Sequence, residues 1–201
     1  CTAQVVEKII HFVSKDAMDI KNLGEANVRK FYELNLLKDI PGIYSLPFDE
    51  VLKLEGFKEK SVAKLKTAIE DSKTQPLYRL IYALGIRFVG ETTAKTLANS
   101  VHHLLDFKNK TVEELQQLED VGIKVASSIQ HFFMNEKNIE MLKTLEQLEV
   151  SLKNEKKENL PIGDLQLLNQ TFLFTGTLLE LKRSEAELKV EEKGGKILSG
   201  V

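Results

Sequence analysis

Four short turns of similar sequence contain the residue types and the spacing that could support chemistry in this 201-residue chain. They are residues 20–24 (IKNLG), 54–58 (LEGFK), 86–90 (IRFVG) and 118–122 (LEDVG). Their fifth position moves from 24 to 58, 90 and 122, in steps of 34, 32 and 32 residues. Apolar residues recur at fixed offsets around each turn, which indicates an internal repeat with one structural unit per copy.

Each turn is predicted to join two helices and to present backbone N–H groups to an anion. A small or β-branched residue four places after the fifth position lets the second helix pack closely on the first; these residues are Val28, Val62, Ala94 and Ala126. We expect the glycine at the fifth position to adopt a positive φ. The N–H groups of the turn and of the next helix's first turn would then lack partners, and a phosphate would satisfy them.

Short helices are expected to position these turns. Apolar residues at helical spacing predict a first helix from Thr2 to about Ser14, and a later helix that contains Ile139, Leu142 and Leu145. Pro76 stands where the first residue of a helix is expected. Thr111 and Glu114 have the spacing of a helix capping box. Residues 15–150 are therefore predicted to form one compact, mainly α-helical domain.

The pattern changes after residue 150. Residues 151–165 contain a polar run and then Pro161, which predicts an exposed linker. In residues 166–201, a β-prone stretch at 172–174 precedes Thr175-Gly176 and a predicted helix over 183–193. This order is typical of the start of an α/β unit. Because about forty residues are few for an independent domain, we expect the chain to stop inside it.

Composition and charge exclude several classes of protein. Hydrophobic residues make up 42% and charged residues 29%, which is typical of a globular chain rather than a disordered one. No apolar run has the length of a membrane span and no signal-peptide pattern is present, which predicts a cytoplasmic protein without a membrane partner. The net charge is −2, so binding to nucleic acid would depend on local geometry. Cys1, the single cysteine, can form neither an internal disulfide nor a zinc site by itself.

The repeated pattern resembles the helix-hairpin-helix motif, a family that holds duplex DNA by its phosphates without reading base sequence. The full motif has two glycines, and the resemblance places Asn22, Phe88 and Asp120 at the first glycine position and Lys58 at the second. Because Phe tolerates a left-handed backbone poorly, the third hairpin is expected to be distorted. Asp120 is expected to repel phosphate.

Basic residues are distributed unevenly among the hairpins. Residues 1–100 carry 15 Lys and Arg against 13 Asp and Glu, whereas residues 101–150 carry 5 against 9. Lys58 also has Lys60 and Lys64 nearby. The second and third hairpins are therefore expected to contribute most to DNA binding, and the fourth the least.

Longer runs resemble the C-terminal half of bacterial NAD-dependent DNA ligases. These runs are residues 10–20 (IHFVSKDAMDI), 54–61 (LEGFKEKS) and 83–94 (ALGIRFVGETTA). Residues 1–4 resemble the end of that family's four-cysteine zinc module, and residues 171–178 with Gly194-Gly195 resemble the start of its BRCT domain. The resemblance implies the end of a zinc module with a leading helix at 1–14, four tandem helix-hairpin-helix motifs at 15–150, a linker at 151–165 and the first part of a BRCT-like domain at 166–201.

The resemblance also implies a function. The family seals nicks in double-stranded DNA during replication and repair by joining a 5′-phosphate to a 3′-hydroxyl, after AMP has passed from NAD to a catalytic lysine. That lysine lies in a Lys-x-Asp-Gly motif that is not found in these 201 residues. We therefore expect no catalytic and no cofactor-binding residue in this chain, and an inactive fragment when it is alone. NAD, Mg²⁺ and Zn²⁺ are expected for the full-length enzyme, in which Cys1 would be a zinc ligand.

The implied partner is nicked double-stranded DNA, bound by a monomer. The residues expected to contact it are Asn22, Leu23, Gly24, Gly56, Phe57, Lys58, Lys60, Arg87, Val89, Gly90, Thr92, Thr93, Val121, Gly122 and Lys124. Two other functions fit the same repeats. One is a protein-interaction or structural helical scaffold, and the other is the DNA-binding module of a different repair protein.

Overall fold

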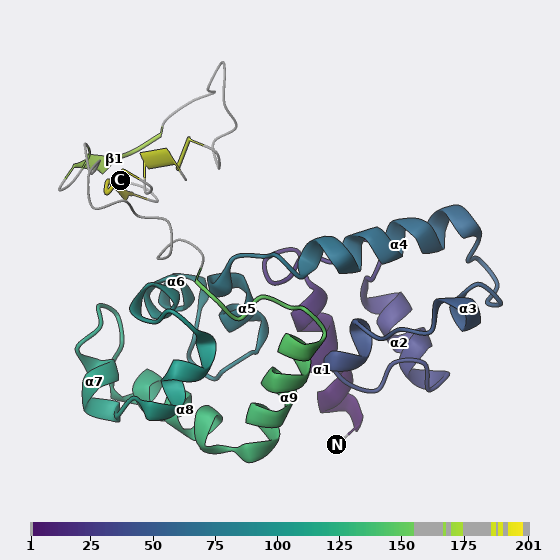
Figure 1. Ribbon diagram of the computed structural model, residues 1–201, viewed down its shortest axis with the longest axis horizontal. Coiled ribbons are helices and arrows are strands. Elements are labelled where there is room, and N and C mark those ends of the chain that lie inside the picture. Colours follow the sequence, from purple (N-terminus) through teal and green to yellow (C-terminus); the bar gives the residue numbers. More distant parts are fainter. Residues whose placement is uncertain are drawn as a thin grey trace. The chain divides into compact units, whose positions relative to one another are not determined.

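A computed structural model describes residues 2–154, together with 167, 170–174, 186–187, 189–190 and 193–198 (Figure 1). The chain divides into two compact units, residues 1–154 and 155–201. Cys1, the pair Thr175-Gly176 and residues 155–165 of the expected linker lie outside the described residues.

The first unit is mainly α-helical, as predicted. Its helices are α1 (Thr2–Val13), α2 (Glu25–Glu33), α3 (Phe48–Val51), α4 (Glu59–Ser72), α5 (Leu77–Ala83), α6 (Glu91–Ser100), α7 (Val112–Gln116), α8 (Ile123–Met134) and α9 (Glu136–Gln147), with 3-10 helices η1 (Pro41–Ile43) and η2 (Leu104–Asn109). In Figure 1, α1–α4 occupy one half of the unit and α6–α8 the other, and α5 packs on both α1 and α6. None of the described helices is long and apolar enough to cross a membrane.

Local sequence explains several helix boundaries. α1 ends at Val13, close to the predicted end. The capping box before α7 is confirmed, because Glu114 N–H donates to Thr111 Oγ1 at 3.2 Å and Thr111 N–H donates to the Glu114 carboxylate at 2.8 Å. The prediction for Pro76 is wrong by one position. Pro76 has an extended ψ of 142° and caps α5, which begins at the next residue.

One apolar core runs through the first unit. Its largest fully buried side chains include Phe12, Phe31, Phe107 and Phe133. The four residues predicted to permit close helix packing are confirmed as buried: Val28, Ala94 and Ala126 are 0% exposed and Val62 is 6% exposed. The second helix of each pair therefore packs closely through this position.

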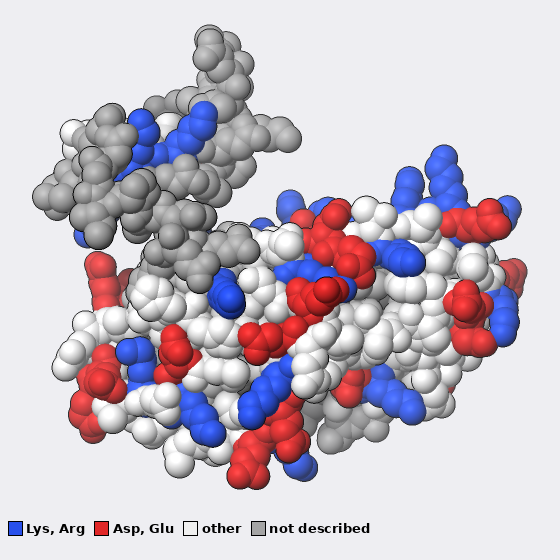
Figure 2. Space-filling view, in the orientation of Figure 1, with Lys and Arg blue, Asp and Glu red and all other residues white. Residues whose placement is uncertain are grey.

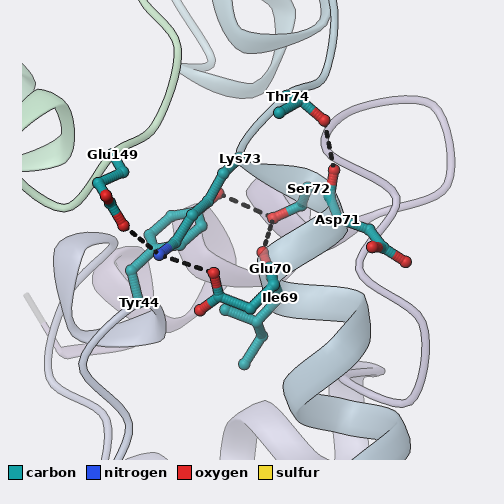
Figure 3. A network of polar contacts seen from close by, with 8 residues as sticks. All are labelled: Tyr44, Ile69, Glu70, Asp71, Ser72, Lys73, Thr74 and Glu149. Carbon is teal, nitrogen blue, oxygen red and sulfur yellow. Dashed lines mark hydrogen bonds and ion pairs between the residues drawn. The ribbon is translucent and has the colours of Figure 1, made fainter.

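A polar network joins the end of α4 to segments that lie far away in sequence (Figure 3). Lys73 Nζ is 2.9 Å from Glu70 Oε2 and 3.4 Å from Glu149 Oε2. The buried Ser72 hydroxyl hydrogen-bonds with the Tyr44 hydroxyl at 3.2 Å and donates to Ile69 O at 2.7 Å. These contacts hold the C-terminus of α4 against the loop after η1 and the chain that follows α9.

The segment after α9 packs across the first unit. Ser151 N–H donates to Lys73 O at 2.8 Å. Asn154, only 6% exposed, donates from Nδ2 to Ala98 O at 2.6 Å and from its backbone N–H to His102 O at 2.8 Å. Through these bonds the segment contacts the ends of both α4 and α6.

The second unit contains a short parallel strand pair. Strand β1 (Thr171–Phe172) pairs with β2 (Lys196–Ile197) in the register Thr171 to Lys196 and Phe172 to Ile197. Between the strands, residues 186–187 and 189–190 are helical. Because parallel strands need a crossover connection, this arrangement agrees with the predicted strand and helix of an α/β unit.

Candidate nucleic-acid interface

The four repeated turns have the same backbone geometry. In each, the N–H of the fourth residue donates to the carbonyl of the first; the pairs are Leu23 to Ile20 (3.3 Å), Phe57 to Leu54 (3.1 Å), Val89 to Ile86 (3.0 Å) and Val121 to Leu118 (3.2 Å). The third residue is left-handed in every turn; Asn22, Gly56, Phe88 and Asp120 have φ of 65°, 89°, 65° and 61°. The fifth residue is extended and is the N-cap of α2, α4, α6 or α8.

Two expectations about these turns are wrong. The positive φ lies at the third residue and not at the fifth, where Gly24, Gly90 and Gly122 have φ of −75°, −89° and −80°. The physical reason is that the tight turn bends at its third residue, whereas a helix N-cap needs an extended backbone. The third hairpin is not distorted, because Phe88 adopts the same left-handed conformation as its three counterparts.

The fold does not require glycine at the fifth position. A Cβ atom placed on Gly24, Gly90 or Gly122 would meet no atom within 4 Å. Lys58 occupies the same position in the second turn with a similar extended backbone, φ −119° and ψ 165°. A glycine that the fold does not need leaves room for a ligand to approach the backbone closely.

Three of the four helix N-termini are open. α2, α6 and α8 have no side-chain cap, and the N–H groups of Gly24, Gly90 and Gly122 have no partner within the described part of the chain. The N–H groups of the first two residues after each glycine also have no intrahelical acceptor. In α2 the third residue, Asn27, donates its N–H to Gly24 O at 3.0 Å. Together with the positive end of the helix dipole, such N–H groups favour an anion.

In the second turn, the backbone N–H at the fifth position is capped by a side chain from the first turn of α4. Lys58 N–H donates to Ser61 Oγ at 2.9 Å, and this hydroxyl donates to Lys58 O at 2.8 Å. Positive charge is available to an anion here instead of a free N–H. Lys58, Lys60 and Lys64, at the end of the turn and in α4, are exposed and have no ion-pair partner among the described residues. Basic side chains project from the outer edge of α4 in Figure 2.

The residues predicted to contact DNA fall into two groups. Leu23, Val89 and Val121 are at most 8% exposed and use their N–H groups inside the turn, as the half-buried Phe57 also does, so these four residues hold the turn in shape. The exposed group contains Asn22, Gly24, Gly56, Lys58, Lys60, Arg87, Gly90, Thr92, Gly122 and Lys124, and Thr93 is half-buried.

Two of the acidic residues that begin the hairpin helices are partly neutralised. Glu25 and Glu91 are the first residues of α2 and α6, and they pair with Arg29 at 2.7 Å and Lys95 at 3.2 Å, one helical turn later. These pairs reduce the repulsion that a carboxylate would exert on a phosphate at the same helix end. Asp19 differs from them because it lies in the loop after α1 and pairs with Lys21 at 2.6 Å.

The first and second turns lie close together, which no sequence signal indicated. Lys30 Nζ donates to Glu55 O at 3.0 Å, and its ammonium group is 5.3 Å from the centre of the Phe57 ring. Asn22 of the first turn and Gly56 of the second turn line the same pocket of about 340 Å³. A groove of about 610 Å³ is lined by residues of the first turn and of α4, among them Asn22 and Lys60. The two turns therefore present one continuous surface.

Comparison with known proteins agrees with this geometry. Residues 79–142, which contain the third and fourth turns, match the helix-hairpin-helix motif family. All 201 residues align with proteins named DNA ligase from Sulfurihydrogenibium azorense at 55% identity, Aquifex aeolicus at 45% and Coxiella burnetii at 43%. The whole chain is similar to one segment of bacterial DNA ligases.

The chain spans 28–29% of the length of these ligases, consistent with a C-terminal fragment of such a protein. The resemblance of its residues to DNA ligases and to the helix-hairpin-helix motif is thereby confirmed. The family match covers the third and fourth turns, and the first two turns share their hydrogen bond and left-handed residue.

Proposed function

We propose that this chain is the part of an NAD-dependent DNA ligase that holds double-stranded DNA around a nick. The observation that carries this proposal is the set of three uncapped helix N-termini, each preceded by a glycine that the fold does not need. Phosphate oxygens accept hydrogen bonds from such N–H groups, and they are present at every nucleotide of a duplex. Because the first two turns share the geometry of the matched pair, we infer that all four are helix-hairpin-helix motifs.

Binding through these groups does not depend on base sequence. Backbone N–H groups and lysine side chains contact phosphates, which position a protein on the duplex without identifying its bases. This property suits a ligase, because nicks arise at any sequence. In the proposed enzyme, residues outside this chain bind NAD and Mg²⁺ and join the 5′-phosphate to the 3′-hydroxyl, and Cys1 completes a zinc site. The chain by itself binds the duplex as a monomer in the cytoplasm. It does not catalyse ligation.

The hairpins contribute in different ways. The third hairpin has an open N-terminus together with the exposed Arg87 and Thr92, so it offers both backbone and side-chain donors. The second hairpin is closed by Ser61 and contributes chiefly through its lysines. The fourth is open but carries Asp120 beside Gly122, which weakens its attraction for phosphate.

The variant Gly90→Val tests the role of the open helix N-termini. The φ of −89° and ψ of −179° at Gly90 suit a β-branched residue, and a Cβ there meets no atom within 4 Å, so the variant is expected to fold. Because valine is a poorer N-cap than glycine, we expect its free energy of unfolding to fall by no more than about 1 kcal/mol. The added methyl groups occupy the space next to the free N–H. We expect the affinity for duplex DNA, measured by fluorescence anisotropy, to fall by about fivefold or more.

Asn99→Val is the matched control, because it introduces the same side chain at an exposed position near the other end of the same helix. Asparagine and valine have similar helix propensities, so this control is expected to fold and to bind DNA like the wild-type chain. Unchanged affinity in folded Gly90→Val would argue against phosphate contact at this helix and would favour the scaffold function.

A further inference from the structure

Phe88 is an exposed aromatic residue in a backbone conformation that it disfavours. Its φ is 65° and its side chain is 52% exposed. The equivalent residues in the other turns are Asn22, Gly56 and Asp120, which are the types that adopt the left-handed region most readily. Strained residues of this kind cluster at functional sites, where the side chain is needed for a contact outside the fold.

The Phe88 ring does not contribute to the described core. The partly buried apolar residues that pack against that core do not include it. Its ring instead lies 4.8 Å from the guanidinium carbon of the neighbouring Arg87. The guanidinium covers part of the ring and leaves the remainder exposed, so the tip of the third hairpin combines an apolar surface with a positive charge.

The open N–H of Gly90 lies two residues from Phe88, at the start of α6. Two residues of extended chain span about 7 Å, so a group held at Gly90 is within reach of the Phe88 ring. In a DNA strand, each phosphate bridges the 3′ carbon of one deoxyribose and the 5′ carbon of the next, and the carbon faces of these sugars line the edge of the minor groove. A phosphate held at Gly90 therefore brings a sugar close to Phe88.

Resting on the proposed function, we propose that Phe88 packs against the deoxyribose of the DNA strand whose phosphate is bound at Gly90. The ring supplies apolar contact and Arg87 supplies charge to an adjacent phosphate. This assignment favours nucleic acid over a protein partner, because the uncapped N–H and the guanidinium on either side of the ring both select an anionic backbone. Apolar side chains are a recurrent means of gripping the minor-groove side of DNA.

The test compares Phe88→Asn with the wild-type chain on nicked and intact duplexes across a salt series. Asn occupies this position in the first turn, so the variant is expected to fold and to melt at the same or a higher temperature. We expect an affinity about tenfold lower and an unchanged slope of log K against log salt, because the lost contact is apolar and releases no counterion. Arg87→Gln is expected to reduce that slope by about one.

Phe88→Tyr retains the ring and is expected to restore most of the affinity. Met134→Gln removes another exposed apolar side chain, 73% exposed at the end of α8, and is the matched control with unchanged binding. Wild-type affinity in Phe88→Asn would overturn the inference while leaving the proposed function intact. A loss accompanied by a smaller salt slope would also overturn it, because the residue would then act through phosphate contacts. Failure of the wild-type chain to bind any duplex would instead overturn the proposed function.

Discussion

Asp120 stands at the left-handed position of the fourth turn, two residues before the open N-terminus of α8. Its exposed carboxylate has no ion-pair partner among the described residues. A negative charge at this distance opposes a phosphate at Gly122, although the backbone there is as open as at Gly24 and Gly90.

Asp120→Asn is predicted to increase the affinity for duplex DNA by about two- to fivefold at low salt. The substitution removes one repulsive charge and keeps a residue type that Asn22 shows to be compatible with this conformation. The gain should diminish as salt rises, because exposed charges are screened. Fluorescence anisotropy at two salt concentrations measures the change, and an affinity that does not respond to the substitution would mean that the fourth turn does not contact DNA.

The conformation and burial of single residues could be predicted only in part from the sequence. Spacing located all four turns and the buried Val28, Val62, Ala94 and Ala126. The expectation of a left-handed third residue, taken from the helix-hairpin-helix resemblance, is confirmed, whereas the positive φ expected at the fifth residue is wrong, because the period of a repeat does not reveal which residue of a turn bends. The backbone penalty expected at Phe88 was also too large, because the turn hydrogen bond and the packing of the flanking helices hold the backbone in place.

The individual helices are short and depend on capping and packing. α7 has five residues, a length at which an isolated helix is unstable in water. It is held by the Thr111–Glu114 capping box and by the buried Leu115. α7 packs on α8, whose N-terminus is one of the three open ends.

Thr111→Ala is predicted to lower the free energy of unfolding by about 1 kcal/mol, because it removes the acceptor for Glu114 N–H. Denaturant unfolding followed by circular dichroism measures this loss. Thr144→Ala in the exposed middle of α9 is the matched control and should cost little, because alanine is a better helix former than threonine. Equal stability of Thr111→Ala and the wild-type chain would show that the capping box does not stabilise α7.

Element boundaries were predictable where the signal is local. The end of α1, the capping box and the apolar face of α9 all follow from residues within one or two helical turns of each other. Pro76 was misplaced by one position, because a proline with an extended ψ serves as a cap as readily as it begins a helix. The closure of the second turn by Ser61 depends on a hydroxyl rotamer, which residue spacing does not specify.

Within the first unit, polar contacts join residues that are far apart in the sequence. Lys73 and Glu149 are 76 residues apart, and Tyr44 and Ser72 are 28 apart. No local pattern predicts such pairs, and the same is true of the groove that Asn22 and Lys60 both line. These contacts arise only when the helices pack into a common core.

Because Tyr44 is buried against the end of α4, the stability of the first unit depends on pH. Burial raises the pKa of Tyr44 from its ordinary value near 10 to about 12, against a smaller opposing effect of the hydrogen bond with Ser72. The unfolded chain therefore loses this proton first as the pH rises. Below pH 10 the protonated Tyr44 contributes fully to the free energy of unfolding. This free energy falls by about 2 to 3 kcal/mol as the pH rises from 10 to 12.

Tyr44→Phe is predicted to remove this fall in the free energy of unfolding between pH 10 and 12. Urea unfolding of both proteins at pH 8, 10 and 11 measures the effect, because the difference in unfolding free energy should shift in favour of the variant as the pH rises. A constant difference across this range would contradict the raised pKa of Tyr44.

Fluorescence anisotropy of this chain on nicked duplex, intact duplex and single-stranded DNA tests most directly whether its hairpins bind DNA through phosphate contacts. Measurements at about 50 and 200 mM salt show the contribution of phosphate contacts, because each contact releases a counterion. We predict that both duplexes bind more tightly than the single strand and that affinity falls by at least tenfold between the two salt concentrations. Absence of duplex binding at the lower salt concentration, or binding that is independent of salt, would contradict this prediction.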